Sequence, residues 1–177
     1  MQAKTIIARP VSRQLKRWHS LRLAMLPLVS ALSLAVAPAV YADEPVQANG
    51  TFTVSFSPLS LRTADGNTFI GYTFSEDMLG SFIGTRVGSG SLVIHPDGSL
   101  NTENSGIFTG TIAGVSGTAL FRYSGSGTFA SAGGSFSVTD GTSGLAGVHA
   151  EGTDSGSATG PTRIAGTYSF KVHFGAP

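Results

Sequence analysis

The sequence predicts an all-β domain, more closely a closed antiparallel barrel of about eight strands, preceded by a cleaved signal peptide. Apolar and polar side chains alternate over residues 51–57 and 163–174, which is the period of a strand with one buried face. All 24 Gly and all 11 Phe lie after residue 42, as in a chain of many short strands joined by tight turns. No stretch after residue 42 has the i, i+3, i+4, i+7 apolar spacing of a helix.

The first 42 residues have the pattern of a secretory signal. Residues 1–22 carry six Lys and Arg and no acid, residues 23–40 are uncharged and apolar, and small residues follow up to Ala42. Pro27 and Pro38 interrupt an apolar run that is already short of the roughly 20 residues a membrane span needs. We therefore expect cleavage after Ala42, export by the general secretory route, and a periplasmic or secreted protein.

Removing the first 42 of 177 residues leaves 135 residues, the size of a single domain. We expect residues 43–49 to be a flexible N-terminal segment and residues 50–177 to form the barrel. Residues 43–177 hold five basic and ten acidic residues, a formal net charge of −5. Such a balance lacks the basic surface that nucleic acid or an anionic membrane would require. The chain has no Cys, so disulfides and thiol chemistry are excluded.

Strand patterns recur along the rest of the chain, at 51–57, 69–75, 81–87, 91–95, 106–113, 118–124, 134–139, 148–153 and 163–174. Turn chemistry predicts turns at 64–67, 96–98, 115–117 and 140–142, one helical turn near 143–146, and a mobile loop over 155–162. Gly inside the strand patterns, as at Gly84 and Gly110, indicates curved strands or close backbone approach. Curvature favours closure, so we expect a barrel rather than a sandwich.

Three parts of the chain carry a resemblance to a known superfamily. Residues 134–152 read as a strand, a Gly-flanked link and a strand, and residues 166–172 close the chain. Residues 74–80 end the second strand in an aromatic, a polar turn and Leu-Gly. Together with Gly-Phe positions in the central hairpin, these segments resemble an uncharacterised bacterial branch of the allene oxide cyclase and dirigent-like β-barrel superfamily. The resemblance implies the barrel and an apolar lumen, and it carries over neither substrate nor reaction.

The candidate ligand-cavity residues lie on the faces that we expect to line the lumen: Tyr72, Phe74, Glu76, Tyr123 and Tyr168. Alternation places Tyr123 inward and Arg122 on the surface. For Tyr168 an ordinary core position is favoured over a cavity-lining one. In the lumen, desolvation would raise the pKa of Glu76 and suit it to proton transfer. In the alternative, Glu76 and Asp77 form a solvated turn, and this interpretation is favoured because charged side chains are rarely buried.

No catalytic or metal-binding motif is recognisable, so catalytic residues stay unidentified and we expect no cofactor and no metal. His149, Glu151 and His173 could meet on two neighbouring strands, but the spacing matches no ligand motif. A solvated polar face is the favoured interpretation of these residues.

The favoured function is the binding of a small apolar or amphipathic molecule in the lumen. The first alternative is a cyclase- or isomerase-type enzyme with an apolar barrel cavity. The second is a structural or self-associating protein, with homo-oligomerisation left open. Nucleic acid is not expected as a partner, nor is a membrane once the signal is removed.

Overall fold

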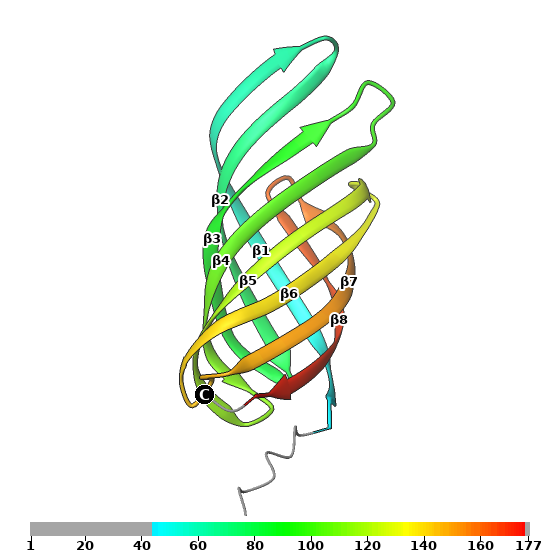
Figure 1. Cartoon of the computed structure of the whole chain (residues 1–177). Helices are drawn as coiled ribbons and strands as arrows, with labels where there is room; N and C mark the ends of the chain where they lie inside the picture. Colours follow the sequence, from blue (N-terminus) through cyan, green and yellow to red (C-terminus); the bar gives the residue numbers. More distant parts are fainter. Residues whose placement is uncertain (1–43, 176–177) are drawn as a thin grey trace, which may run out of the picture. The chain divides into compact units, whose positions relative to one another are not determined.

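The computed structural model describes residues 44–175, and the predicted signal peptide lies outside these residues. Eight antiparallel strands form one closed ring in which each strand pairs with the next and β8 pairs with β1 (Figure 1). Their bounds are β1 (Val46–Ala64), β2 (Asn67–Gly80), β3 (Phe82–Ile94), β4 (Leu100–Ile112), β5 (Val115–Thr128), β6 (Ser131–Ser143), β7 (Val148–Gly160) and β8 (Arg163–Phe174). The prediction of an all-β fold of about eight antiparallel strands is confirmed. The described residues contain no helix long and apolar enough to cross a membrane.

The strands are longer than predicted, at 12 to 19 residues. The predicted strands 81–87 and 91–95 are parts of β3. Residues 155–162 were expected to be a mobile loop, but β7 runs to Gly160 and only a two-residue turn follows. Residues 46–49 were expected to be flexible and instead pair with β8. In residues 88–90 and 155–160, Ser, Gly and Thr occupy paired strands, because backbone pairing with two neighbours outweighs their weak strand propensity.

Two of the four predicted turns are confirmed and two are displaced. Asp65-Gly66 joins β1 to β2 with φ angles of 51° and 77°, and residues 95–99 join β3 to β4 around Gly98. Residues 115–117 and 140–142 lie within β5 and β6 instead. The turn before β5 is Ala113-Gly114, where Ala113 has a φ of 49°. That conformation is uncommon for Ala, so the turn was predicted at Ser116-Gly117, three residues further along the chain.

The ring is uneven along its axis. The β1–β2 and β3–β4 hairpins extend past the turns of the β5–β6 and β7–β8 hairpins (Figure 1). β1 pairs with β2 as far as Ala64 but with β8 only as far as Ser55. A bulge between Pro58 and Ser60 marks the part of β1 that has left the ring. The long hairpins therefore stand at one end, above the turns of the other four strands.

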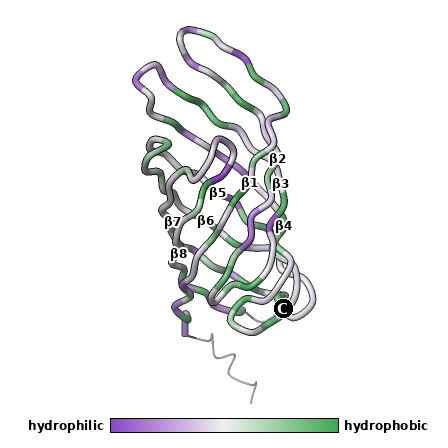
Figure 2. The backbone as a smooth tube through the Cα atoms, turned by 180° about the vertical axis from the view of Figure 1, so that it is seen from behind, coloured by the Kyte–Doolittle hydropathy of each residue, from purple (hydrophilic) through white to green (hydrophobic). Residues whose placement is uncertain are grey.

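The opposite end, which we call the base, is filled by the chain's own side chains. Phe82, Phe108, Phe121 and Phe170 are at most 1% exposed, and Phe82 contacts the other three at ring-centroid distances of 4.9–6.1 Å. Aliphatic side chains from the strand ends and the β6–β7 turn complete the seal: Ile112, Leu145, Val148 and Val172. Hydropathy changes over short stretches along the strands, as one-sided burial requires (Figure 2).

The aromatic side chains inside the ring lie against glycines of the neighbouring strands. A Cβ placed on Gly84 or Gly110, which pair across β3 and β4, would stand about 3 Å from Cζ of Phe108. A Cβ on Gly134 would stand 2.5 Å from Cε2 of Tyr123. Real Cβ atoms do not approach so closely, so these rings need glycine beneath them. A Cβ on Gly84 or Gly110 would also stand 2.2–2.3 Å from a backbone oxygen of the partner strand, so the close backbone approach predicted for these two positions is confirmed.

Candidate functional site

Above the base the ring encloses a cavity of about 180 Å³. The cavity reaches the end of the ring where Phe129 and Pro161 lie in the β5–β6 and β7–β8 turns. Apolar and aromatic side chains supply most of its wall: Phe52, Val54, Phe56, Pro58, Ile70, Tyr72, Leu92, Leu100, Tyr123, Phe129, Phe136 and Ile164. The polar side chains on the wall are few: Glu76, Arg86, Thr102, Asn104, Asp154, Thr162 and Arg163.

Three of the five predicted cavity residues line this space, namely Tyr72, Glu76 and Tyr123. Phe74 and Tyr168 do not line it. Phe74 lies beneath Arg86, and Tyr168 belongs to the filled base.

The Tyr168 hydroxyl holds the β2–β3 connection instead of facing a cavity. It accepts a hydrogen bond from the backbone N–H of Phe82 at 2.9 Å and donates to the carbonyl of Leu79 at 3.0 Å. Burial raises the pKa of the hydroxyl, with the Phe82 backbone acting in the opposite direction. Tyr168 is thus a structural residue with its hydroxyl fully used.

Glu76 and Arg86 form a buried ion pair at the floor of the cavity. The two residues are partners across β2 and β3, each side chain is no more than 3% exposed, and Arg86 Nε donates to Glu76 Oε2 at 2.5 Å. The guanidinium carbon lies 4.6 Å from the ring centre of Phe74 and 4.8 Å from that of Phe136. Burial raises the pKa of Glu76, and Arg86 partly offsets this effect.

The expectation that Glu76 and Asp77 form a solvated turn is therefore wrong. β2 continues to Gly80, so Glu76 keeps the inward phase of Tyr72 while Asp77 faces outward and is exposed. Arg86, the partner of Glu76 on β3, supplies the opposite charge that makes the burial of Glu76 tolerable.

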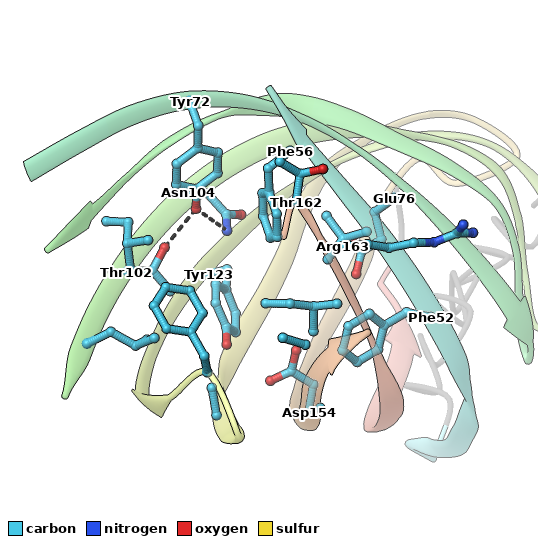
Figure 3. A pocket seen from close by; sticks show the side chains of 18 of the residues that line it. Phe52, Phe56, Tyr72, Glu76, Thr102, Asn104, Tyr123, Asp154, Thr162 and Arg163 are labelled. Carbon is cyan, nitrogen blue, oxygen red and sulfur yellow. Dashed lines mark hydrogen bonds between the residues drawn. The ribbon is translucent and has the colours of Figure 1, made fainter. Parts of the chain in front are cut away.

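A directed chain of hydrogen bonds crosses one wall of the cavity (Figure 3). Thr102 donates its hydroxyl proton to the carbonyl of Ser91 at 3.0 Å. Since that proton is used, the 2.7 Å contact between Thr102 and Tyr72 is a donation from the Tyr72 hydroxyl. Asn104 Nδ2 donates to Tyr72 in turn at 3.3 Å. The other amide atom, Asn104 Oδ1, is buried and has no partner among the described residues.

Asp154 and Tyr123 lie near each other on the cavity wall (Figure 3). Asp154 Oδ1 accepts a hydrogen bond from the backbone N–H of Gly134 at 2.8 Å. Burial raises the pKa of Asp154 to about 6, although the Gly134 N–H opposes the rise. Burial raises the pKa of Tyr123 as well, and the charge of Asp154 adds to this. At neutral pH the cavity therefore presents an ionised carboxylate beside a neutral phenol.

Sequence reasoning missed Arg86 and Asp154. Both signals were present in the alternation. Asp154 shares the phase of Val148, Ala150 and Gly152, but the predicted strand stopped at residue 153. Arg86 lies on the inward face of β3 between Gly84 and Gly88. The sequence of β3 alone does not show that Glu76 is its partner.

The outer face of β7 and β8 carries the histidines. His149 and His173 are cross-strand partners with rings stacked at 5.4 Å, while Glu151 pairs with Lys171. Within residues 44–175 no three His, Cys, Asp or Glu side chains converge as metal ligands. The predicted meeting of His149 and His173 is thus observed, but Glu151 faces a lysine. Arg122 is exposed, as expected from the alternation.

Comparison with known proteins gives a fold and no activity. No family model matches the chain, and no curated protein matches it. A solved structure is similar: a protein of unknown function from the DUF3224 family of Shewanella oneidensis MR-1, with a TM-score of 0.61 and 18% identity. The likeness covers 76% of this chain and all of that one. It shows the fold alone.

Proposed function

We propose that this protein binds a small, largely apolar molecule inside the ring. The observation that carries the proposal is the cavity of about 180 Å³, walled by aromatic and aliphatic side chains and closed beneath by the filled base. Binding sites for small molecules are commonly apolar hollows with a few convergent polar groups. Apolar cavities of about 150 Å³ admit benzene. The enclosed part of the ligand is therefore about the size of one ring.

The proposal agrees with the resemblance to the allene oxide cyclase and dirigent-like barrels, which implies an apolar lumen. We also propose that Tyr72 and Asn104 orient one polar group of the ligand. Asn104 Oδ1 is a buried acceptor without a partner in the described part of the chain. A ligand hydroxyl or N–H placed there would satisfy it.

The test is ligand-induced stabilisation with compounds of one ring or two fused rings, namely toluene, phenol and indole. Binding raises the melting temperature by mass action. Ala132→Phe places a ring in the cavity and is expected to abolish the shift, whereas Ser131→Phe, at an exposed neighbouring position, keeps it. Native mass spectrometry would show one ligand per chain. No shift and no adduct with any of these compounds would overturn the proposal.

A second candidate is a cyclase- or isomerase-type enzyme, and the observation favouring it is Asp154. Its pKa of about 6 is close to the value a general acid or base needs near neutral pH, and Tyr123 stands beside it. The test is to incubate a molecule that copurifies with the protein and to follow it by chromatography for an isomeric product. Conversion that Asp154→Asn abolishes would support an enzyme, and an unchanged molecule would count against one.

We further propose that the protein is exported and acts in the periplasm or outside the cell. The basic, apolar and small-residue pattern of residues 1–42 supports this. The intact mass of the exported protein should correspond to a chain that begins at Asp43. A mass that still includes residues 1–42 would refute cleavage.

A further inference from the structure

We infer that the ligand is a small organic cation, with an amine or ammonium group at Asp154 and its apolar body among the aromatic rings of the cavity. This inference rests on the proposed binding in the lumen and adds the chemical class of the ligand. It is carried by the charges that line the cavity and by the partners each of them has.

Four charged side chains line the cavity: Glu76, Arg86, Asp154 and, at its exposed rim, Arg163. Glu76 and Arg86 neutralise each other in the ion pair, which is the single salt bridge among the described residues. Asp154 has no cationic partner and accepts its hydrogen bond from a neutral backbone N–H. Buried charges are normally paired, so an unpaired carboxylate on a cavity wall is a place for a cation.

Arg86 is a poor receptor for an anion. Its charge is engaged by Glu76, and the faces of Phe74, Phe121 and Phe136 lie 4.6–5.7 Å from its guanidinium carbon. Its Nη1 atom has no hydrogen-bond partner among the described residues, but aromatic rings surround the guanidinium. An anion drawn to this site would also meet the charges of Glu76 and Asp154, which repel it.

The aromatic walls suit a cation for a second reason. Tyr72, Tyr123, Phe52, Phe56 and Phe136 all line the cavity. The negative face of an aromatic ring attracts a cation, more strongly where water is excluded. Asp154 would supply the counter-charge, and the rings would hold the rest of the molecule.

The pH dependence of binding follows from the groups around Asp154. These are Tyr123 on β5, the Gly134 backbone on β6, Glu76 on β2, Arg86 on β3 and, at the rim, Arg163 on β8. Asp154 is ionised above a pKa of about 6 and neutral below it. The preference for a cation should therefore decline as the pH falls through 6.

The experiment compares three ligands of one shape by isothermal titration at pH 7.5: benzylamine, benzyl alcohol and benzoate. We expect benzylamine to bind about tenfold tighter than benzyl alcohol, as one charge-assisted hydrogen bond predicts, and benzoate to bind most weakly. Asp154→Asn should make the amine and the alcohol equal while leaving alcohol binding intact, which also shows that the variant is folded. Glu151→Gln, an exposed carboxylate on the same strand, should keep the preference.

Each outcome bears on one proposal. If benzyl alcohol binds as tightly as benzylamine, or if Asp154→Asn keeps the preference, the cation inference is overturned and lumen binding stands. If none of the three binds while toluene or indole does, the cation inference again falls alone. If neither these three compounds nor toluene, phenol or indole binds, both proposals fall.

Discussion

Removing Arg86 should destabilise the protein strongly, because it would leave Glu76 as an unpaired carboxylate in the interior. Both side chains are no more than 3% exposed. Breaking a buried ion pair by removing one partner costs about 3–5 kcal/mol. In Arg86→Met the methionine retains most of the volume packed against Phe74 and Phe136, so the loss is mainly electrostatic. For a domain of this size, the melting temperature should fall by about 10–20 °C.

The pH dependence identifies the cause. The pKa of Glu76 is already raised by burial in the native protein, and Arg86 opposes that rise. Without Arg86 the folded-state pKa rises further above the unfolded value. A raised carboxyl pKa destabilises the folded state at pH above that pKa, and the penalty disappears as the pH falls toward the unfolded value near 4.5. Arg86→Met should therefore regain stability between pH 7 and pH 5.

The assay is urea unfolding followed by circular dichroism at pH 7 and pH 5. Glu76→Gln combined with Arg86→Met removes both charges and should recover most of the loss, since uncharged replacements of a buried pair are often neutral. Asp77→Asn, at the exposed neighbouring carboxylate, should change the free energy of unfolding by less than about 0.5 kcal/mol. The reasoning is refuted if Arg86→Met lies within about 1 kcal/mol of the wild type at pH 7, or if its deficit is the same at pH 5.

Three further predictions concern the wall and the base. Gly134→Ala should cost about 1–3 kcal/mol, because its Cβ would stand 2.5 Å from the Tyr123 ring. Gly160→Ala, whose Cβ would make an ordinary contact with Arg163 Cβ at 3.8 Å, should be nearly neutral in the same urea assay. Tyr168→Phe leaves buried backbone groups of the β2–β3 connection unpaired and should cost about 1–3 kcal/mol in thermal unfolding; an unchanged melting temperature would mean that the hydroxyl is dispensable. Asp154 has a folded pKa of about 6 against 3.8, so its ionisation opposes folding above pH 6. Asp154→Asn should be more stable than the wild type by about 1–3 kcal/mol at pH 8, with the gain vanishing between pH 6 and pH 4. Equal stability at pH 8 would contradict the raised pKa of this partly buried carboxylate.

The sequence predicted the ring because alternation survives wherever an apolar face is buried, as in residues 51–57 and 163–174. It did not predict where strands end. In residues 155–160 Ser, Gly and Thr pair as strand, yet their composition is that of a loop. The underestimated length of β7 is the reason that Asp154 was missed as a site residue, since it lies one residue beyond the predicted end of the strand.

The ion pair escaped prediction for a different reason. A charged residue on an apolar face is usually at the surface, and burial of Glu76 becomes reasonable only once its partner is known. That partner depends on the register between β2 and β3, which sets Glu76 opposite Arg86. Register is a property of the assembled ring and cannot be read from either strand alone. The aromatic character of the lumen, in contrast, was evident from Tyr72 and Tyr123.

Because the base is filled, the cavity is open at one end only. A ligand bound as proposed would leave by the end through which it entered, because the filled base blocks passage through the ring. Substitutions that only narrow or widen this opening should change the association and dissociation rate constants by the same factor. The residues of the cavity wall would then determine the affinity, and those at the rim would determine the residence time. The two quantities could be altered separately.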